Sequence, residues 1–154
     1  MRTINKEKII ESCGHVVVLK GGSSSEREIS LLSGEAVYQK LLEIGVNVSV
    51  LDVGDTIVAD LENLKPDLAL IMLHGQGGED GTIQGLLELL KIPYSGSGVL
   101  ASALAMDKVK SKLIWQCMGL NAADYVKLNE ATDWQALIDD FEVAVVKPVN
   151  GGSS

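Results

Sequence analysis

The feature that most constrains the fold is a change of hydrophobic period near the start of the chain. Residues 16–19 form a continuous apolar run rich in β-branched side chains, which is typical of a strand buried on both faces of a parallel sheet. Beyond residue 28, apolar side chains recur at three- and four-residue spacing, which predicts a helix with one apolar face. These helical positions are Ile29, Leu32, Ala36, Val37, Leu41 and Ile44. Strand, turn and helix together predict the opening of a βαβ unit.

The turn between this strand and this helix contains the first candidate site. It reads Lys20-Gly21-Gly22-Ser23-Ser24-Ser25-Glu26-Arg27-Glu28. Ser25 and Glu28 have the spacing of a capping box, which predicts that the helix begins at Ser25 and has Glu26 in its first turn. Free N–H groups at a helix start would suit an anion, whereas the Glu26 carboxylate would suit a substrate ammonium or hydroxyl. Alternatively, Glu26 could bind no ligand and only stabilise the positive end of the helix dipole. The dinucleotide fingerprint G-x-G-x-x-G is absent.

Two further strands are predicted at residues 46–53 and 68–73, with a short one at 92–94. The third strand runs into the loop His74-Gly75-Gln76-Gly77-Gly78-Glu79-Asp80-Gly81. Glu79 and Asp80 are interpreted as cap and dipole partners of the next helix rather than as paired catalytic carboxylates. Because strands and helices alternate, we expect a parallel sheet covered on both faces, with its glycine-bearing turns lining one crevice at the carboxyl edge.

The character of the chain changes at residue 106. Asp107 is predicted to cap a helix that ends near Cys117, and strands are predicted at 125–128 and 143–146, with an acidic helix at 133–140 between them. The last strand runs into Lys147-Pro148-Val149-Asn150-Gly151-Gly152-Ser153-Ser154, a cation beside a loop of N–H and O–H donors that would suit a polyphosphate. Lys108, in the first helical turn, favours a ligand role, whereas Lys110 and Lys112 are assigned to a solvated face.

The predicted organisation is a polar extension over residues 1–14, an α/β domain over 15–105, and the incomplete start of a second domain over 106–154. The net charge of −8, without any cluster of more than two adjacent cations, excludes an obvious nucleic-acid-binding face. No apolar run is long enough to span a membrane. Only two cysteines occur, without a C-x-x-C pair, which favours a reduced, cytoplasmic setting.

Five segments taken together resemble D-alanine–D-alanine ligase, a bacterial ATP-grasp enzyme of peptidoglycan synthesis. They are residues 20–30, 74–81, 93–98, 106–108 and 147–154. The resemblance implies a Rossmann-like, pre-ATP-grasp sheet domain followed by the truncated start of an ATP-grasp central domain. It also implies D-alanine, ATP and magnesium as the reactants and cofactor, an acyl phosphate intermediate, and a homodimer.

The resemblance also implies roles for individual residues. Glu26 would hold the ammonium of the first D-alanine, and Ile29 and His74 would lie near the same substrate. Ser153 would help position Glu26. Lys108, Lys147 and Ser154 would contact ATP, the lysines by neutralising charge on the phosphates.

The family's magnesium ligands, lid tyrosine and acyl-phosphate arginine would all lie beyond Ser154. We therefore expect a chain that ends there to be inactive alone. Two alternatives stay open at this stage. The chain could be a non-catalytic binding or oligomerisation module, or it could come from a D-alanine–D-lactate type of ligase, which shares the same amino-terminal motifs.

Overall fold

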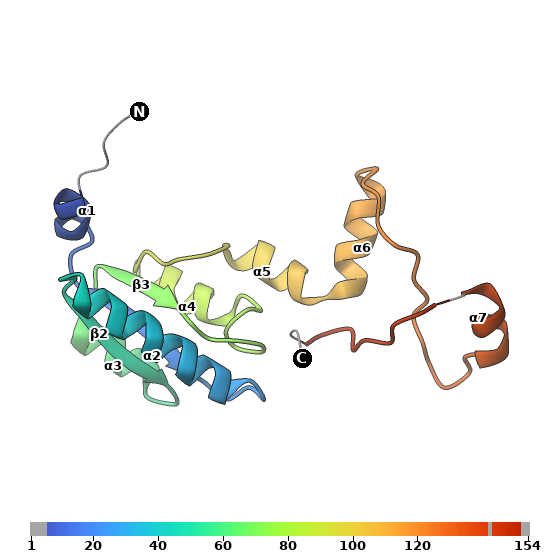
Figure 1. The fold of residues 1–154 in the computed structure, drawn as a ribbon, viewed down its shortest axis with the longest axis horizontal. Coiled ribbons are helices and arrows are strands. Elements are labelled where there is room, and N and C mark those ends of the chain that lie inside the picture. Colours follow the sequence, from blue (N-terminus) through green and yellow to red (C-terminus); the bar gives the residue numbers. More distant parts are fainter. Residues whose placement is uncertain (1–5, 142, 152–154) are drawn as a thin grey trace.

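The computed structural model describes residues 6–141 and 143–151. Figure 1 shows a sheet with its helices at one end of an elongated molecule and a series of helices and loops extending from it. The elements in chain order are α1 (Lys6–Ser12), β1 (Val16–Gly21), α2 (Arg27–Glu43), β2 (Val48–Val53), α3 (Ile57–Leu64), β3 (Leu68–Ile71), α4 (Thr82–Leu89), α5 (Val99–Met106), α6 (Lys108–Cys117) and α7 (Trp134–Asp140).

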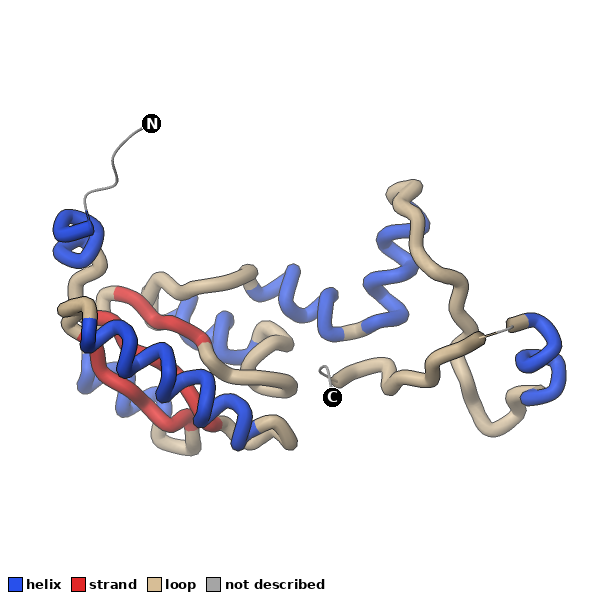
Figure 2. Tube along the Cα trace, viewed as in Figure 1, coloured by secondary structure: helices blue, strands red, loops and turns tan. Residues whose placement is uncertain are grey.

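The sheet has the order β2-β1-β3, and both pairings are parallel, as the alternation of strands and helices predicted. Figure 2 draws the strands in red, beside the helices in blue. Val16 lies opposite Val48 in β2 and opposite Leu68 in β3, so the three strands start level. The predicted short strand at 92–94 is a single parallel bridge between Ala69 and Tyr94 at the β3 edge. All three strands therefore end at one edge of the sheet, where their connecting loops meet.

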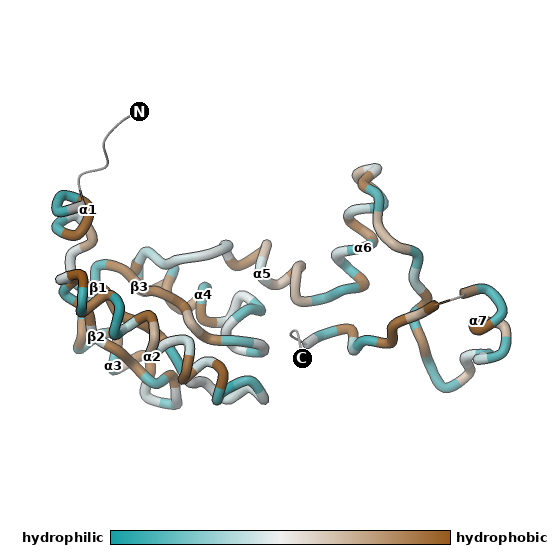
Figure 3. Tube along the Cα trace, viewed as in Figure 1, coloured by the Kyte–Doolittle hydropathy of each residue, from teal (hydrophilic) through white to brown (hydrophobic). Residues whose placement is uncertain are grey.

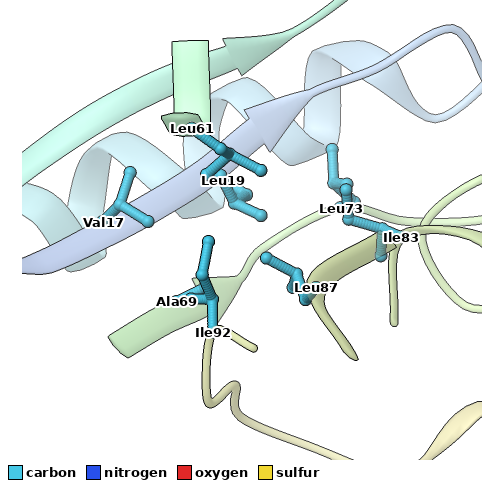
Figure 4. Close-up of a cluster of buried hydrophobic side chains, with 8 residues drawn as sticks. All are labelled: Val17, Leu19, Leu61, Ala69, Leu73, Ile83, Leu87 and Ile92. Carbon is cyan, nitrogen blue, oxygen red and sulfur yellow. The ribbon is translucent and has the colours of Figure 1, made fainter. Parts of the chain in front are cut away.

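Two apolar clusters cover the two faces of the sheet. One, drawn in Figure 4, joins the sheet to α3 and α4, and the other joins it to α1 and α2. The first consists of Val17, Leu19, Leu61, Ala69, Leu73, Ile83, Leu87 and Ile92. The second consists of Val16, Val18, Val46 and Val48, with Ile10, Cys13, Val37, Tyr38 and Leu41 among the side chains packed around it. Successive residues of β1 thus alternate between two apolar layers, which explains its continuous hydrophobic run.

The face of α2 that packs on the sheet differs from the predicted one. Ser30 and Gly34 are buried, whereas Ile29 is 56% exposed and Leu32 is 70% exposed. The reason is the closeness of the helix to the strands. A Cβ on Gly34 would collide with the side chain of Lys20, so only small residues fit along this line. Helical spacing identified the helix correctly but assigned part of its apolar face wrongly.

Lys20 ends β1 with a charged side chain in a strand that is otherwise apolar. Its stem lies across Gly34, and its Nζ is 2.6 Å from Oε2 of Glu35 in α2. The same hydrogen bond from Lys20 holds the pKa of Glu35 below its usual value. Lys20 therefore fastens the end of the strand to the helix that covers it.

The chain after residue 106 is only partly as predicted. Asp107 caps α6 by accepting a hydrogen bond from the Lys110 N–H, and Asp133 caps α7 in the same way through Gln135 and Ala136. The strands predicted at 125–128 and 143–146 are absent from the described residues, because no neighbouring strand is there to pair with them.

Many apolar side chains in this part of the chain are exposed. Figure 3 colours hydrophobic stretches between α6 and the carboxyl end brown along the backbone trace. The exposed ones are Leu113, Trp115, Met118, Leu120, Val126, Trp134, Ile138, Val143, Val145 and Val146. At the other end of the chain, the stretch predicted as a polar extension contains α1, whose Ile10 packs on the sheet.

Candidate functional site

The loop after β1 is held by one serine hydroxyl. Ser24 Oγ accepts a hydrogen bond from the Glu26 N–H at 3.1 Å and donates to the backbone carbonyl of His74 at 2.7 Å. The helix begins at Arg27 with Glu26 as its N-cap, and no side chain caps it. The predicted capping box at Ser25 is therefore wrong. A turn closed by the Arg27 N–H on the Ser24 carbonyl occupies those positions instead. Glu26 sits at the helix entrance, one residue before the first turn.

The loop after β3 is held by two carboxylates. Glu79 accepts a hydrogen bond from the Gly75 N–H, and Asp80 accepts one from the Gly77 N–H and one from the Thr82 N–H at the start of α4. Partial burial acts to raise the pKa of Asp80, but the hydrogen bonds from Gly77 and Thr82 outweigh it and hold that pKa below its usual value. Both carboxylates order backbone N–H groups of this loop. The predicted cap role was wrong, because the N-cap of α4 is Gly81 without a side-chain cap, although Asp80 accepts a hydrogen bond from the first N–H of the helix.

These two loops form one wall of the larger cavity, which has a volume of about 500 Å³. The opposite wall comes from α5, the start of α6, and the loop near residue 150, which returns to the start of α6 through the Asp107–Asn150 bridge. The lining residues are Ser23, Ser24, Ser25, Glu26, Gly75, Gln76, Asp80, Ala103, Met106, Asp107, Lys110, Asn150 and Gly151. Glu26 thus faces a space enclosed by segments that are far apart in the sequence.

A smaller cavity of about 180 Å³ lies beside the first, and Ser23 and Gln76 line both. It sits directly at the carboxyl edge of the sheet, between the loops that follow β1, β2 and β3. His74 lines this smaller cavity and does not line the larger one. The sequence placed His74 and Glu26 beside one substrate. The structure puts them in adjoining hollows, linked through Ser24.

An ion pair braces the glycine turn from the outside. Arg27 makes two hydrogen bonds to the Asp52 carboxylate, at 2.7 and 2.5 Å, and its Nη1 also donates to the Gly22 carbonyl at 3.0 Å. The hydrogen bonds between the two side chains raise the pKa of Arg27 and lower that of Asp52. The bidentate geometry fixes the loop before Glu26 to the end of β2.

The predicted phosphate-contacting lysines are placed differently from one another. Lys108 Nζ donates to the Gly151 carbonyl at 2.8 Å, which ties the start of α6 to the returning loop. Lys147 is exposed and lines neither cavity. Lys110 was assigned to a solvated face, yet it lines the larger cavity and pairs with Asp107 at 2.9 Å. Its place could have been inferred from its spacing, three residues after the Asp107 cap and on the same side of α6.

Three further predicted residues can be placed only in part. Ile29 is exposed on α2 and lines neither cavity. Ser153 and Ser154 lie outside the described residues. Sequence reasoning also overlooked Asn150, which lines the larger cavity opposite Glu26's loop.

Over residues 6–141 and 143–151, no cluster of three or more histidine, cysteine, aspartate or glutamate side chains could hold a metal ion. The same residues include no helix that is long and apolar enough to cross a membrane.

The fold places the chain in the class of parallel α/β proteins, with its cavities at the carboxyl edge of the sheet, where such folds commonly bind ligands. Comparison with known proteins indicates which family within this class the chain resembles. A family model described as "D-ala D-ala ligase N-terminus" matches residues 52–97. The chain is similar along nearly its whole length to the amino-terminal portion of D-alanine–D-alanine ligases, which confirms the resemblance carried by its motifs.

The similar curated proteins include the D-alanine–D-alanine ligase of Pseudomonas entomophila, 50% identical over 146 residues, which are 94% of this chain and 46% of that protein. The ligase of Ralstonia pickettii is 53% identical over 145 residues, covering 94% of this chain and 44% of that protein. The chain thus spans less than half the length of these relatives.

Solved structures agree with the fold. The Bacillus anthracis D-alanine–D-alanine ligase complexed with ATP is 35% identical, with a TM-score of 0.75 over 90% of this chain and 48% of that one. The Coxiella burnetii ligase is 29% identical, with a TM-score of 0.73 over 90% of this chain and 54% of that one.

Proposed function

We propose that this chain is the amino-terminal portion of an ATP-dependent ligase that joins two D-alanines for peptidoglycan synthesis. In this proposal, residues 15–105 bind the first D-alanine, and residues 106–154 begin the ATP-binding part. The proposal rests mainly on Glu26, whose carboxylate lines the 500 Å³ cavity in a chain similar to D-alanine–D-alanine ligases along nearly its whole length.

Glu26 supplies the charge that an amino-acid substrate requires. A carboxylate held at the rim of a partly enclosed cavity forms a charge-assisted hydrogen bond with an ammonium, which is stronger than a bond between neutral groups. Its backbone N–H is fixed by Ser24, so the side chain leaves the main chain from a defined point. In this assignment Glu26 binds and orients the first D-alanine, and His74 contacts it from the adjoining smaller cavity. Ile29 is not among the contacts, because it is exposed on α2 and lines neither cavity.

We assign ATP to the segments that form the other wall of the cavity and continue beyond it. Its phosphates would contact Lys108 and Lys147, which lie in these segments outside the cavity lining, and Ser154, while Ser153 would support Glu26. Positive charge there would stabilise the transferring phosphoryl group as the first D-alanine is activated to an acyl phosphate. We assign the binding of magnesium and the attack by the second D-alanine to parts of the ligase outside this chain, which spans less than half the length of its relatives. The homodimer stays a prediction, to be checked by mass from light scattering.

The test is a chimaera in which this chain is joined to the remaining carboxyl-terminal portion of the Pseudomonas entomophila ligase. We expect the chimaera to release ADP from ATP and magnesium only when D-alanine is present, and the chain alone to release none. Failure of the chimaera to use D-alanine, although it is folded and binds ATP, would contradict the proposal.

The role of Glu26 is tested by Glu26→Gln in the chimaera. Loss of a charged hydrogen bond costs about 1.5–3 kcal/mol, so the KM for the first D-alanine should rise about 10- to 100-fold while the KM for ATP changes little. Glu28→Gln is the matched control, because Glu28 is an exposed carboxylate in the first turn of the same helix and lines neither cavity. Equal effects of the two substitutions would contradict the assignment.

A further inference from the structure

The hydroxyl of Ser33 lies between a helix carbonyl and the His74 ring. Ser33 is two turns into α2, and its Oγ is 3.2 Å from the Ser30 carbonyl oxygen and 3.2 Å from Nε2 of His74. A serine hydroxyl has one proton to donate and can accept with its lone pairs. It therefore cannot donate to both neighbours, and the choice decides which ring nitrogen of His74 carries a proton.

Serine side chains within a helix commonly donate back to the carbonyl three or four residues earlier, which is the arrangement of Ser33 and Ser30. With the hydroxyl proton directed there, Ser33 has only lone pairs to offer to His74. Nε2 of His74 must then be the donor in the contact between them. The imidazole is consequently held with its proton on Nε2 and a bare lone pair on Nδ1.

His74 lines the 180 Å³ cavity at the carboxyl edge of the sheet, and within the described part of the chain its Nδ1 has no hydrogen-bond partner. We propose that Ser33 is a positioning residue that fixes the Nε2-protonated tautomer of His74, so that Nδ1 faces a ligand as an acceptor. The ligand group that fits is an N–H or O–H donor, such as an ammonium, rather than a bare carboxylate.

The inference deepens the proposed function, because the ammonium-bearing ligand would be D-alanine. It differs from the role of Glu26 in one respect. Glu26 attracts the ammonium by charge, whereas a neutral imidazole locked in one tautomer supplies direction. Ser24, which donates to the His74 carbonyl and accepts from the Glu26 N–H, keeps the two acceptors at a fixed spacing.

The chain contains a matched control, since it has only two histidines and both contact a serine through Nε2. His15 Nε2 is 2.8 Å from Oγ of Ser49, near the amino-terminal ends of β1 and β2, whereas the smaller cavity lies at the carboxyl ends of the strands. The imidazole nitrogens of both rings can be followed together in the 154-residue chain by long-range ¹H–¹⁵N NMR at alkaline pH, where neutral tautomers are distinguished. Ser49→Ala identifies the His15 signals.

We expect His74 to carry its proton on Nε2 in the unsubstituted chain, to become a mixture of tautomers in Ser33→Ala, and to recover in Ser33→Thr, which keeps the hydroxyl. Ser49→Ala should leave the His74 signals unchanged. A proton on Nδ1 of His74 in the unsubstituted chain would overturn the proposal, and this result needs no variant to fold. Unchanged His74 nitrogens in Ser33→Ala would overturn it as well.

A kinetic arm uses the chimaera. Loss of one neutral hydrogen bond, worth about 0.5–1.5 kcal/mol, should raise the KM for D-alanine about 3- to 10-fold in Ser33→Ala, with kcat little changed and recovery in Ser33→Thr. A chimaera that does not use D-alanine at all would count against the proposed function and leave the tautomer result intact. A normal KM in Ser33→Ala would overturn the positioning role.

Discussion

At the scale of single residues, the site depends on close approach of two loops. Gly75 has a positive φ of +68°, and a Cβ there would lie 2.8 Å from Oε2 of Glu26. Gly77, in the same loop, also has a positive φ, but a Cβ there would meet no atom within 4 Å. Both Gly→Ala substitutions should cost about 1 kcal/mol of stability through backbone strain, and only Gly75→Ala should also displace Glu26.

This pair separates strain from displacement of the site. We expect thermal unfolding to show similar losses for Gly75→Ala and Gly77→Ala, whereas the KM for D-alanine in the chimaera should rise only for Gly75→Ala. A similar rise in both variants would mean that the conformation of the whole loop, rather than the space beside Glu26, sets substrate affinity.

At the scale of elements, α2 is joined to the sheet by a buried hydroxyl. Ser30 is fully buried, and its Oγ accepts a hydrogen bond from the Gly21 N–H at 2.8 Å and donates to the Met72 carbonyl at 2.7 Å. Ser30→Ala leaves both backbone groups without this partner, so it should lower the free energy of unfolding by about 2 kcal/mol in urea titrations. Ser25→Ala should change it by less than about 0.5 kcal/mol, because Ser25 is exposed and does not cap the helix. If Ser25→Ala instead lowered the free energy of unfolding by about 1 kcal/mol, Ser25 would be a capping residue of the helix, as the sequence predicted.

The same helix shows what sequence patterns determine and what they miss. Hydrophobic spacing located α2, the parallel strands and the glycine turns at their carboxyl ends, because these follow from local periodicity. The roles of Ser30 and Gly34 were not predicted, since a polar or small residue becomes an interface residue only when a strand comes close to it. The strands predicted at 125–128 and 143–146 were wrong for a related reason: a β-prone segment forms a strand only when a neighbouring strand pairs with it.

In the candidate site, too, the residues within sequence motifs were predicted, and those brought in by tertiary packing were not. Glu26 and the loop after β3 were found from their motifs. The sequence did not predict that Lys110 and Asn150 line the larger cavity, because their positions there depend on how the loop near residue 150 returns to α6. The Ser33–His74 contact likewise joins residues 41 positions apart and leaves no local pattern in the sequence.

At the scale of the whole molecule, the buried core lies in the first part of the chain, and the described residues after 106 add exposed apolar side chains but no buried ones. Both apolar clusters, with the side chains packed around them, draw only on residues 10–94. After residue 106, by contrast, Val143 is 87% exposed and Val145 is 76% exposed. A chain shortened to residues 1–106 should therefore keep its cooperative thermal transition within a few degrees of the 154-residue chain, because it loses no core side chain.

The shortened chain should also associate less, since it lacks the exposed apolar surface of residues 113–146. Circular dichroism would give the two midpoints, and light scattering over a concentration series would give the association of each chain.

Limited proteolysis of the 154-residue chain should cut first beyond residue 106 and leave a stable fragment that ends near there. A midpoint that falls sharply on shortening, or early cleavage within residues 16–94, would mean that the later segments stabilise the sheet. The cavity between them would then be a fixed part of the fold rather than a space that forms when the two parts meet.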